Sequence, residues 1–179
     1  MNRAALEHIV RAAAAVANEH DIVVIGSQAV LGQFPDAPEA LLVSIEADVF
    51  PRQAPDKSGL IDGAIGELSM FHQTFGYYAH GVDETTATLP EGWTDRLVPV
   101  CNENTGGATG WCLDVHDLAV SKLVAGREKD FEFLRVLLRE KMADAGLLLD
   151  RLRMVALPPD RLELLVQRLL RVARSSGGA

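Results

Sequence analysis

Cysteine is scarce in this sequence, and the spacing of Cys101 and Cys112 indicates neither a disulfide framework nor a zinc site. Aromatic residues make up only 6% of the chain. No apolar run approaches the roughly 18 residues that a membrane-spanning helix needs. The first ten residues also lack the basic start and apolar centre of a secretory signal. These absences predict a cytoplasmic protein with free thiols and no membrane association.

Hydrophobic residues are plentiful, at 48% of 179 positions, which is enough for one globular domain with a substantial core. The net charge of −8 argues against a broad nucleic-acid-binding surface. The charge is uneven, because residues 1–120 contain 5 basic and 17 acidic side chains, whereas residues 121–179 contain 12 and 8. Two interpretations remain open: two differently charged solvated faces, or a cleft with an acidic wall for cations and a basic wall for phosphates.

The first part of the chain predicts a helix, a strand and a second helix in succession. Apolar residues at helical spacing and many alanines predict a helix over residues 3–18. The β-branched run IVVI, residues 22–25, predicts a buried strand. Helical character resumes in SQAVLGQF, residues 27–34, with Ser27 as the expected N-cap. The Gly26-Ser27 pair is therefore expected at a tight turn between strand and helix.

A second strand, LLVSIEADVF over residues 41–50, carries two carboxylates. Successive strand side chains point to opposite faces, so Glu46 and Asp48 are expected on one face and Ala47 and Val49 on the other. Two like charges about 7 Å apart on one sheet face repel each other. Either this face is wet, or a cation lies between the two carboxylates.

The remaining elements are a helix near residues 58–68, strands near residues 75–82, 96–100 and 111–114, and a loop over residues 101–110. From Asp114 the pattern becomes helical, with Asp114 as the expected N-cap and Asp117 completing a variant of the capping box. Further helices follow, and the last is expected to start at Pro158 and Pro159. The segment 175–179 has the composition of a disordered tail.

Two lysines interrupt an apolar stripe of the helix expected after Asp114. The stripe follows increments of four, four, three and four residues and consists of Leu118, Lys122, Gly126, Lys129 and Phe133. The lysines either pass apolar neighbours to reach water or extend into a cavity that holds an anion. A glycine inside a helix costs about 1 kcal/mol relative to alanine, so Gly126 marks either a break between two helices or a close approach to the backbone.

The order of these elements resembles a known fold. A Gly-Ser turn after a strand, then a helix, then the acid-x-acid pair Glu46-Ala47-Asp48 on the next strand resembles the nucleotidyltransferase fold of the DNA polymerase β type. The runs FGYYAHGV, LPEGWTDRLVPV and LDVHDLAVSKLVAGREKDFEFL are similar to a poorly characterised bacterial group of nucleotidyltransferase-like proteins, related to abortive-infection toxins of toxin-antitoxin systems. The similarity spans about residues 20–140.

The resemblance implies an α/β (α+β) fold with a mixed sheet flanked by helices. It implies a nucleotidyltransferase-like core over residues 1–115 and a C-terminal helical part of the same domain over residues 116–174. The implied reaction moves a nucleoside monophosphate from a nucleoside triphosphate to an unknown acceptor, which is RNA, a protein or a small molecule. Such a reaction depends mainly on positioning and on neutralising the charge that develops. An antitoxin-like protein is the implied partner.

The resemblance also assigns roles to particular residues. The paired acids Glu46 and Asp48 are the implied catalytic residues and the ligands of Mg2+ or Mn2+, which prefer carboxylate and phosphate oxygens. The implied nucleotide contacts come from the Gly-Ser turn and from the Lys-x4-Arg-x-Lys-Asp run: Gly26, Ser27, Lys122, Arg127, Lys129 and Asp130.

The sequence departs from the pattern of this fold at two points, and both bear on whether the protein is catalytically active. Glu46 stands where aspartate is commoner, which displaces the carboxylate by about one methylene. The third carboxylate usually comes from a later strand, and four acids beside expected strands are candidates: Asp83, Asp95, Glu103 and Asp114. The alternative to an active enzyme is therefore a catalytically inactive module that binds a nucleotide or a partner protein.

The histidines and tyrosines of the middle segment give no functional pattern. His72, His80 and His116 do not form a metal cluster by spacing, so core or surface positions are the favoured interpretation. Tyr77 and Tyr78 are most simply packing aromatics.

Overall fold

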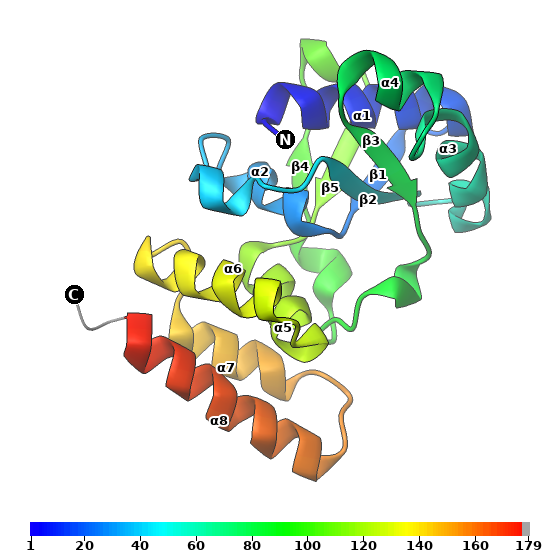
Figure 1. The fold of residues 1–179 in the computed structure, drawn as a ribbon. Coiled ribbons are helices and arrows are strands. Elements are labelled where there is room, and N and C mark those ends of the chain that lie inside the picture. Colours follow the sequence, from blue (N-terminus) through cyan, green and yellow to red (C-terminus); the bar gives the residue numbers. More distant parts are fainter. Residues whose placement is uncertain (177–179) are drawn as a thin grey trace. The chain divides into compact units, whose positions relative to one another are not determined.

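The structure is a computed structural model that describes residues 1–176 (Figure 1). Contacts within the chain divide it into two compact units. Residues 1–86 and 97–114 form the first, which we call the sheet unit. Residues 87–96 and the chain from Val115 onward form the second, which we call the helical unit.

The sheet unit contains a mixed sheet in the strand order β3-β2-β1-β5-β4. Its strands are β1 (Asp21–Val24), β2 (Glu46–Pro51), β3 (Tyr78–Gly81), β4 (Val98–Val100) and β5 (Thr109–Cys112). Strand β1 runs parallel to β5 and antiparallel to β2, while β3 runs parallel to β2 and β4 antiparallel to β5. A mixed sheet with flanking helices confirms the predicted α/β fold class.

Helices cover one face of this sheet. The helices of the unit are α1 (Arg3–Ala17), α2 (Val30–Gln33), α3 (Ser58–Ile65) and α4 (Met70–Phe75). A Cβ atom on Gly110 would lie 2.7 Å from Cγ2 of Val10 in α1. A Cβ atom on Gly81 would lie 2.0 Å from the carbonyl oxygen of Ser58 in α3. Strand register places these two glycines on the same face, so α1 and α3 pack there at distances that only glycine permits.

The helical unit contains α5 (Val115–Ala125), α6 (Glu128–Arg139), α7 (Ala145–Arg153) and α8 (Pro159–Ser176), together with a 3-10 turn at Trp93–Arg96. Its core is made of leucines at helical spacing, including Leu118, Leu123, Leu134, Leu137, Leu148, Leu152, Leu165 and Leu169. The start of α8 at Pro159 agrees with the sequence prediction.

A buried carboxylate, Asp117, connects three segments of the helical unit. Arg96 donates from Nε to Asp117 Oδ2 at 2.8 Å and from Nη2 to Oδ1 at 3.2 Å. Nε of Arg151 in α7 lies 3.7 Å from Asp117 Oδ1. The side chain of Asp117 is fully buried. Asp117 therefore forms an ionic link from α5 to the 87–96 segment and to α7.

Several boundaries differ from the sequence prediction around the acidic strand. The strand predicted over residues 41–50 begins only at Glu46, because a 3-10 turn occupies Glu39–Leu41 and Val43 is 80% exposed. The Ser44 hydroxyl contacts the backbone N–H and C=O of Glu46, a local bond that competes with strand pairing. Helix α4 was not predicted, although it carries the usual signals of a Ser69 N-cap and a left-handed Gly76 at its end.

A turn and a strand also differ from the sequence prediction. Ser27 is the first residue of a 3-10 turn, Ser27–Ala29, and Gly26 rather than Ser27 occupies the N-cap. The last strand covers Thr109–Cys112 instead of residues 111–114. The strand is shifted by two residues, while the helix predicted over residues 27–34 begins as a 3-10 turn and becomes α-helical only at Val30.

Gly126 separates two helices, which confirms one of the two readings of this residue. Its φ of +68° lies in the left-handed region that favours glycine, and it falls between the end of α5 and the start of α6. The predicted continuous stripe is therefore broken, and Lys122 and Lys129 belong to different helices.

At the C-terminal end, α8 continues through Ser176, two residues into the tail predicted over residues 175–179. Residues 177–179 lie outside the described part of the chain. Across residues 1–176, none of the helices combines the length and apolar character required to cross a membrane.

Candidate functional site

Glu46 and Asp48 lie on one face of β2, as the strand alternation predicts. Both are partly exposed, whereas the intervening Ala47 and the following Val49 are fully buried. The buried residues share their face with Gly81 and hence with α1 and α3. The two carboxylates therefore point to the opposite face of the sheet.

Strand β3 places a hydrogen-bond partner beside each carboxylate. The parallel register pairs Glu46 with Tyr78 and Asp48 with His80. The Tyr78 hydroxyl donates to Oε2 of Glu46 at 2.8 Å. Nδ1 of His80 lies 3.0 Å from Oδ1 of Asp48. Because an ionised carboxylate only accepts hydrogen bonds, Nδ1 of His80 is the donor.

The phenol of Tyr78 keeps its proton over the whole physiological range. Burial, and next the hydrogen bond and negative charge of Glu46, raise the pKa of Tyr78 to about 12. Tyr78 is therefore a permanent neutral donor to Glu46.

The Gly-Ser turn touches the second acid directly. A Cβ atom on Gly26 would lie 2.1 Å from Oδ2 of Asp48, and the Ile25 N–H donates to the Asp48 carbonyl at 3.0 Å. The backbone of the turn thus lies against the Asp48 oxygen that His80 leaves unengaged. Ser27, half-buried, begins the 3-10 turn that follows. The structure therefore brings Gly26, Ser27 and the acidic pair together in the sheet unit.

Replacing Gly26 with alanine should damage the site at this contact. Since a methyl group would overlap Oδ2, the Asp48 side chain must move, and we expect a loss of about 1–3 kcal/mol in the free energy of unfolding. Urea unfolding followed by circular dichroism measures this loss. Gly63→Ala is the matched control, because a Cβ atom there meets nothing within 4 Å. That helical substitution should stabilise by about 0.5–1 kcal/mol. Equal behaviour of the two variants would contradict the contact.

The four candidates for a third carboxylate occupy different places. Asp83 follows β3 and accepts hydrogen bonds from the backbone and hydroxyl of Thr85, which lower the pKa of Asp83. Asp95 lies in the helical unit, and Glu103 is exposed in a short 3-10 turn. Asp114 follows β5 in the sheet unit.

Among these candidates, Asp114 lies at the sheet edge that carries the Gly-Ser turn. Strands β1 and β5 are parallel with Val24 opposite Cys112, and the Leu113 N–H donates to the Val24 carbonyl. The chain therefore leaves both strands at the same edge. Within residues 1–176, however, no group of three His, Cys, Asp or Glu side chains is arranged to hold a metal ion.

The Lys-x4-Arg-x-Lys-Asp run forms a compact charge cluster in the helical unit. Arg127 donates from Nε to Oδ2 of Asp130 at 2.8 Å, and Nζ of Lys122 lies 3.8 Å from Oδ1. Asp130 is 1% exposed. The ammonium of Lys122 also lies 5.8 Å from the Phe133 ring centre, and its side chain is only 12% exposed. Lys122 therefore does not extend into open solvent, whereas Lys129 is exposed on α6.

This cluster predicts an acid-dependent stability. Burial opposes ionisation of Asp130, but hydrogen bonds from Arg127 and the charge of Lys122 outweigh it and lower the pKa of Asp130. Because the pKa of Asp130 is lower in the folded than in the unfolded state, this group stabilises the folded protein at pH values above the unfolded-state pKa, near 4. The stabilisation is lost as the pH falls from there through the folded-state pKa. Urea unfolding followed by circular dichroism should show that Asp130→Asn narrows the difference in unfolding free energy between pH 7 and pH 3. The exposed control Asp150→Asn should retain the wild-type dependence, and parallel curves for Asp130→Asn would refute the assignment.

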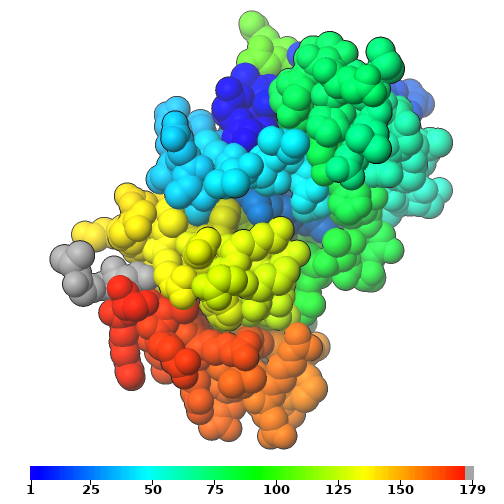
Figure 2. Space-filling model, viewed as in Figure 1, coloured from blue at the N-terminus to red at the C-terminus, as the bar shows by residue number. Residues whose placement is uncertain are grey.

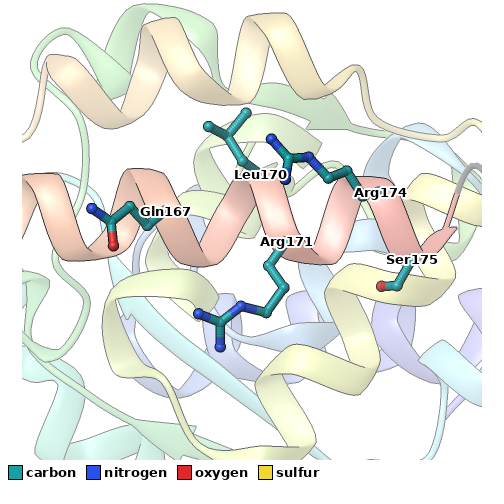
Figure 3. Close-up of a pocket in the computed structure, with 5 residues that line it drawn as sticks. All are labelled: Gln167, Leu170, Arg171, Arg174 and Ser175. Carbon is teal, nitrogen blue, oxygen red and sulfur yellow. The ribbon is translucent and has the colours of Figure 1, made fainter.

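The outer side of α8 in the helical unit carries a hollow of about 520 Å3 (Figure 3). Its lining consists of Gln167, Leu170, Arg171, Arg174 and Ser175. Two guanidinium groups without a lining carboxylate suit an anion rather than a metal ion. The C-terminal part of α8 is visible in red in Figure 2. Leu164 and Leu170 of this helix are exposed large hydrophobic residues. The sequence prediction did not include this hollow.

Comparison with known proteins gives one finding about function. Residues 4–153 match a family described as "Nucleotidyltransferase of unknown function (DUF6036)". No curated protein and no solved structure matches the chain significantly. The matched range contains the Gly-Ser turn, the acidic pair and the Asp130 cluster.

Proposed function

The chain belongs to this family of nucleotidyltransferases of unknown function, and on this premise we propose that it moves a nucleoside monophosphate from a nucleoside triphosphate to an acceptor. The observation that carries the proposal is the contact between the Gly-Ser turn and Asp48, where backbone and carboxylate oxygen meet without room for a Cβ atom. A phosphate held by the turn would lie beside the acidic pair.

Glu46 and Asp48 are the residues that would hold Mg2+ or Mn2+. Each carboxylate has one oxygen hydrogen-bonded to β3, and its second oxygen is not used in that bond. Hard divalent cations prefer such oxygens, and Mg2+ commonly binds to one or two carboxylates together with substrate phosphates and water. When bound, the cation would neutralise charge on the triphosphate and the leaving pyrophosphate.

The phosphate contacts that we assign to the turn depend on its backbone and on the Ser27 hydroxyl. Helix α2 has only four residues, so its dipole adds little. In the helical unit, we assign phosphate binding to Lys122 and Arg127, with exposed Lys129 as a further cation. Buried Asp130 would position the first two through its ion pairs.

The acceptor that we propose is RNA, a protein or a small molecule. A role in a toxin-antitoxin pair, with an antitoxin-like protein partner, would fit the resemblance of the sequence to abortive-infection toxins. We place this activity in the cytoplasm.

One observation favours a second candidate function. Within residues 1–176 the acidic pair is not joined by a third His, Cys, Asp or Glu that could complete a metal site. In nucleotidyl transfer a third carboxylate would activate the attacking hydroxyl. A catalytically inactive module that binds a nucleotide or a protein partner would need no such group.

Calorimetry with ATP, GTP, CTP and UTP, with Mg2+ and with EDTA, tests these proposals, together with an assay for pyrophosphate release. Mg2+-dependent binding with pyrophosphate release would support the enzyme. Binding of a triphosphate without release, in the presence of candidate RNA and protein acceptors, would favour the inactive module. Failure of all four triphosphates to bind would overturn both nucleotide-based functions.

A further inference from the structure

We propose that Tyr78 and His80 of β3 form an orienting pair, which fixes the Glu46 and Asp48 carboxylates and thereby sets the affinity of the site for a divalent cation. This inference rests on the proposed function, because it concerns the same carboxylates. It assigns a positioning role to two residues for which the sequence predicted only packing, core or surface positions.

The register of the sheet places the two residues of the orienting pair directly opposite the two acids. Residues at positions i and i+2 of β3 face residues i and i+2 of β2, so each donor has one carboxylate opposite it. The two hydrogen bonds of 2.8 and 3.0 Å are direct cross-strand contacts. A side chain that belongs to a rigid strand fixes its partner more precisely than a side chain from a loop.

The first donor, Tyr78, is itself held in place. It is 9% exposed, and the ring of His72 from α4 lies 4.7 Å from its own ring. Its hydroxyl donates to Oε2 of Glu46 at 2.8 Å. The hydrogen bond therefore restricts rotation of the Glu46 side chain. Because Glu46 has one methylene more than aspartate, its carboxylate would otherwise take up more positions.

The second donor, His80, determines which oxygen of Asp48 is engaged. Its Nδ1 engages Oδ1, while Oδ2 lies against the Gly26 backbone, where a phosphate held by the turn would approach. The side chains of His80 and Asp48 are 50% and 25% exposed, so this contact is at the surface of the sheet unit and not in its core. Packing alone gives no reason for the contact, because the core face of β3 is formed by Ala79 and Gly81.

The neutral phenol also distinguishes this site from two other glutamates of the sheet unit, which are paired with cations. Glu7 and Glu19 form ion pairs with Arg3 and Lys57. An arginine or lysine beside Glu46 would cancel the negative charge that attracts a cation, whereas a neutral phenol orients the carboxylate and leaves the charge in place. Groups that orient metal ligands in this way typically change metal affinity by about 10-fold to 100-fold when they are mutated.

The test is the dissociation constant of Mn2+ alone, measured by electron paramagnetic resonance without any nucleotide. Tyr78→Phe and His80→Ala should each raise the constant by about 10-fold or more. His80→Asn should recover much of the loss, because its amide N–H can replace Nδ1–H. Two matched controls are Tyr77→Phe, whose hydroxyl contacts His8 instead, and His20→Ala at the opposite end of β1. Both controls should remain within twofold of the wild type.

The outcomes separate this inference from the proposed function. If the wild type binds Mn2+ and the dissociation constants of all the β3 variants stay within twofold of it, the orienting role is overturned while the metal site is supported. Absence of Mn2+ binding by the folded wild-type protein, with and without ATP, would overturn the metal site and the orienting role together. Circular dichroism melting of each variant shows whether it is folded, and His80→Asn gives a conservative comparison if Tyr78→Phe unfolds.

Discussion

Replacing Asp48 with asparagine should reduce metal-dependent pyrophosphate release by about 100-fold to 1000-fold. The amide keeps the size of the side chain but removes the negative charge that would attract a cation. It can also place an N–H group at the oxygen position that lies against Gly26. Loss of one charged metal ligand removes several kcal/mol of transition-state stabilisation, and each 1.36 kcal/mol corresponds to a factor of ten in rate. The measurement is the release rate at saturating triphosphate and Mg2+.

The control for this substitution is Asp36→Asn, an exposed aspartate of the same unit. Its rate should match the wild type within about twofold. If Asp48→Asn released pyrophosphate at the wild-type rate, the observed activity would not depend on this acidic pair. The family membership would be unaffected.

Replacing Asp117 with alanine should lower the free energy of unfolding by about 3–5 kcal/mol, because it leaves buried or half-buried arginines without their carboxylate. Nε of Arg151 has no hydrogen-bond partner among the described residues, and in this variant it would also lose the Asp117 carboxylate 3.7 Å away. Urea unfolding followed by far-ultraviolet circular dichroism measures the effect.

A second aspartate of the helical unit gives the comparison for Asp117. Asp150 has a 70% exposed side chain that pairs with Arg153 at 3.6 Å. Its replacement with alanine should change the free energy of unfolding by no more than about 0.5 kcal/mol. Similar losses for the two variants would show that the Asp117 network contributes no more than a surface ion pair.

Local sequence patterns were sufficient for much of the fold. Helical spacing predicted α1 within one residue of its end, and the Pro158-Pro159 pair predicted the start of α8. Alternation in Glu46-Ala47-Asp48 predicted that the two carboxylates share a face. These features depend on residues within a few positions of one another, so the sequence contains the information directly.

The features that the sequence did not reveal depend on pairing between distant segments. The contact of His80 with Asp48 joins residues 32 positions apart, and it follows from the parallel register of two strands separated by α3 and α4. One signal was present: Tyr78 and His80 have the same i, i+2 spacing as the acids. The Asp117 link to Arg96 has the same origin, since it joins residues 21 positions apart.

The membership of residues 87–96 in the helical unit means that neither unit is a continuous stretch of chain. The backbone passes from one unit to the other three times, after residues 86, 96 and 114. No single cut can release either unit intact. A fragment starting at Val115 would keep Asp117 but lack Arg96, while a fragment ending at Asp114 would keep a ten-residue segment without the helices it packs with. During synthesis, residues 87–96 of the helical unit leave the ribosome before residues 97–114 of the sheet unit, so the helical unit cannot be completed until the whole sheet unit has been made.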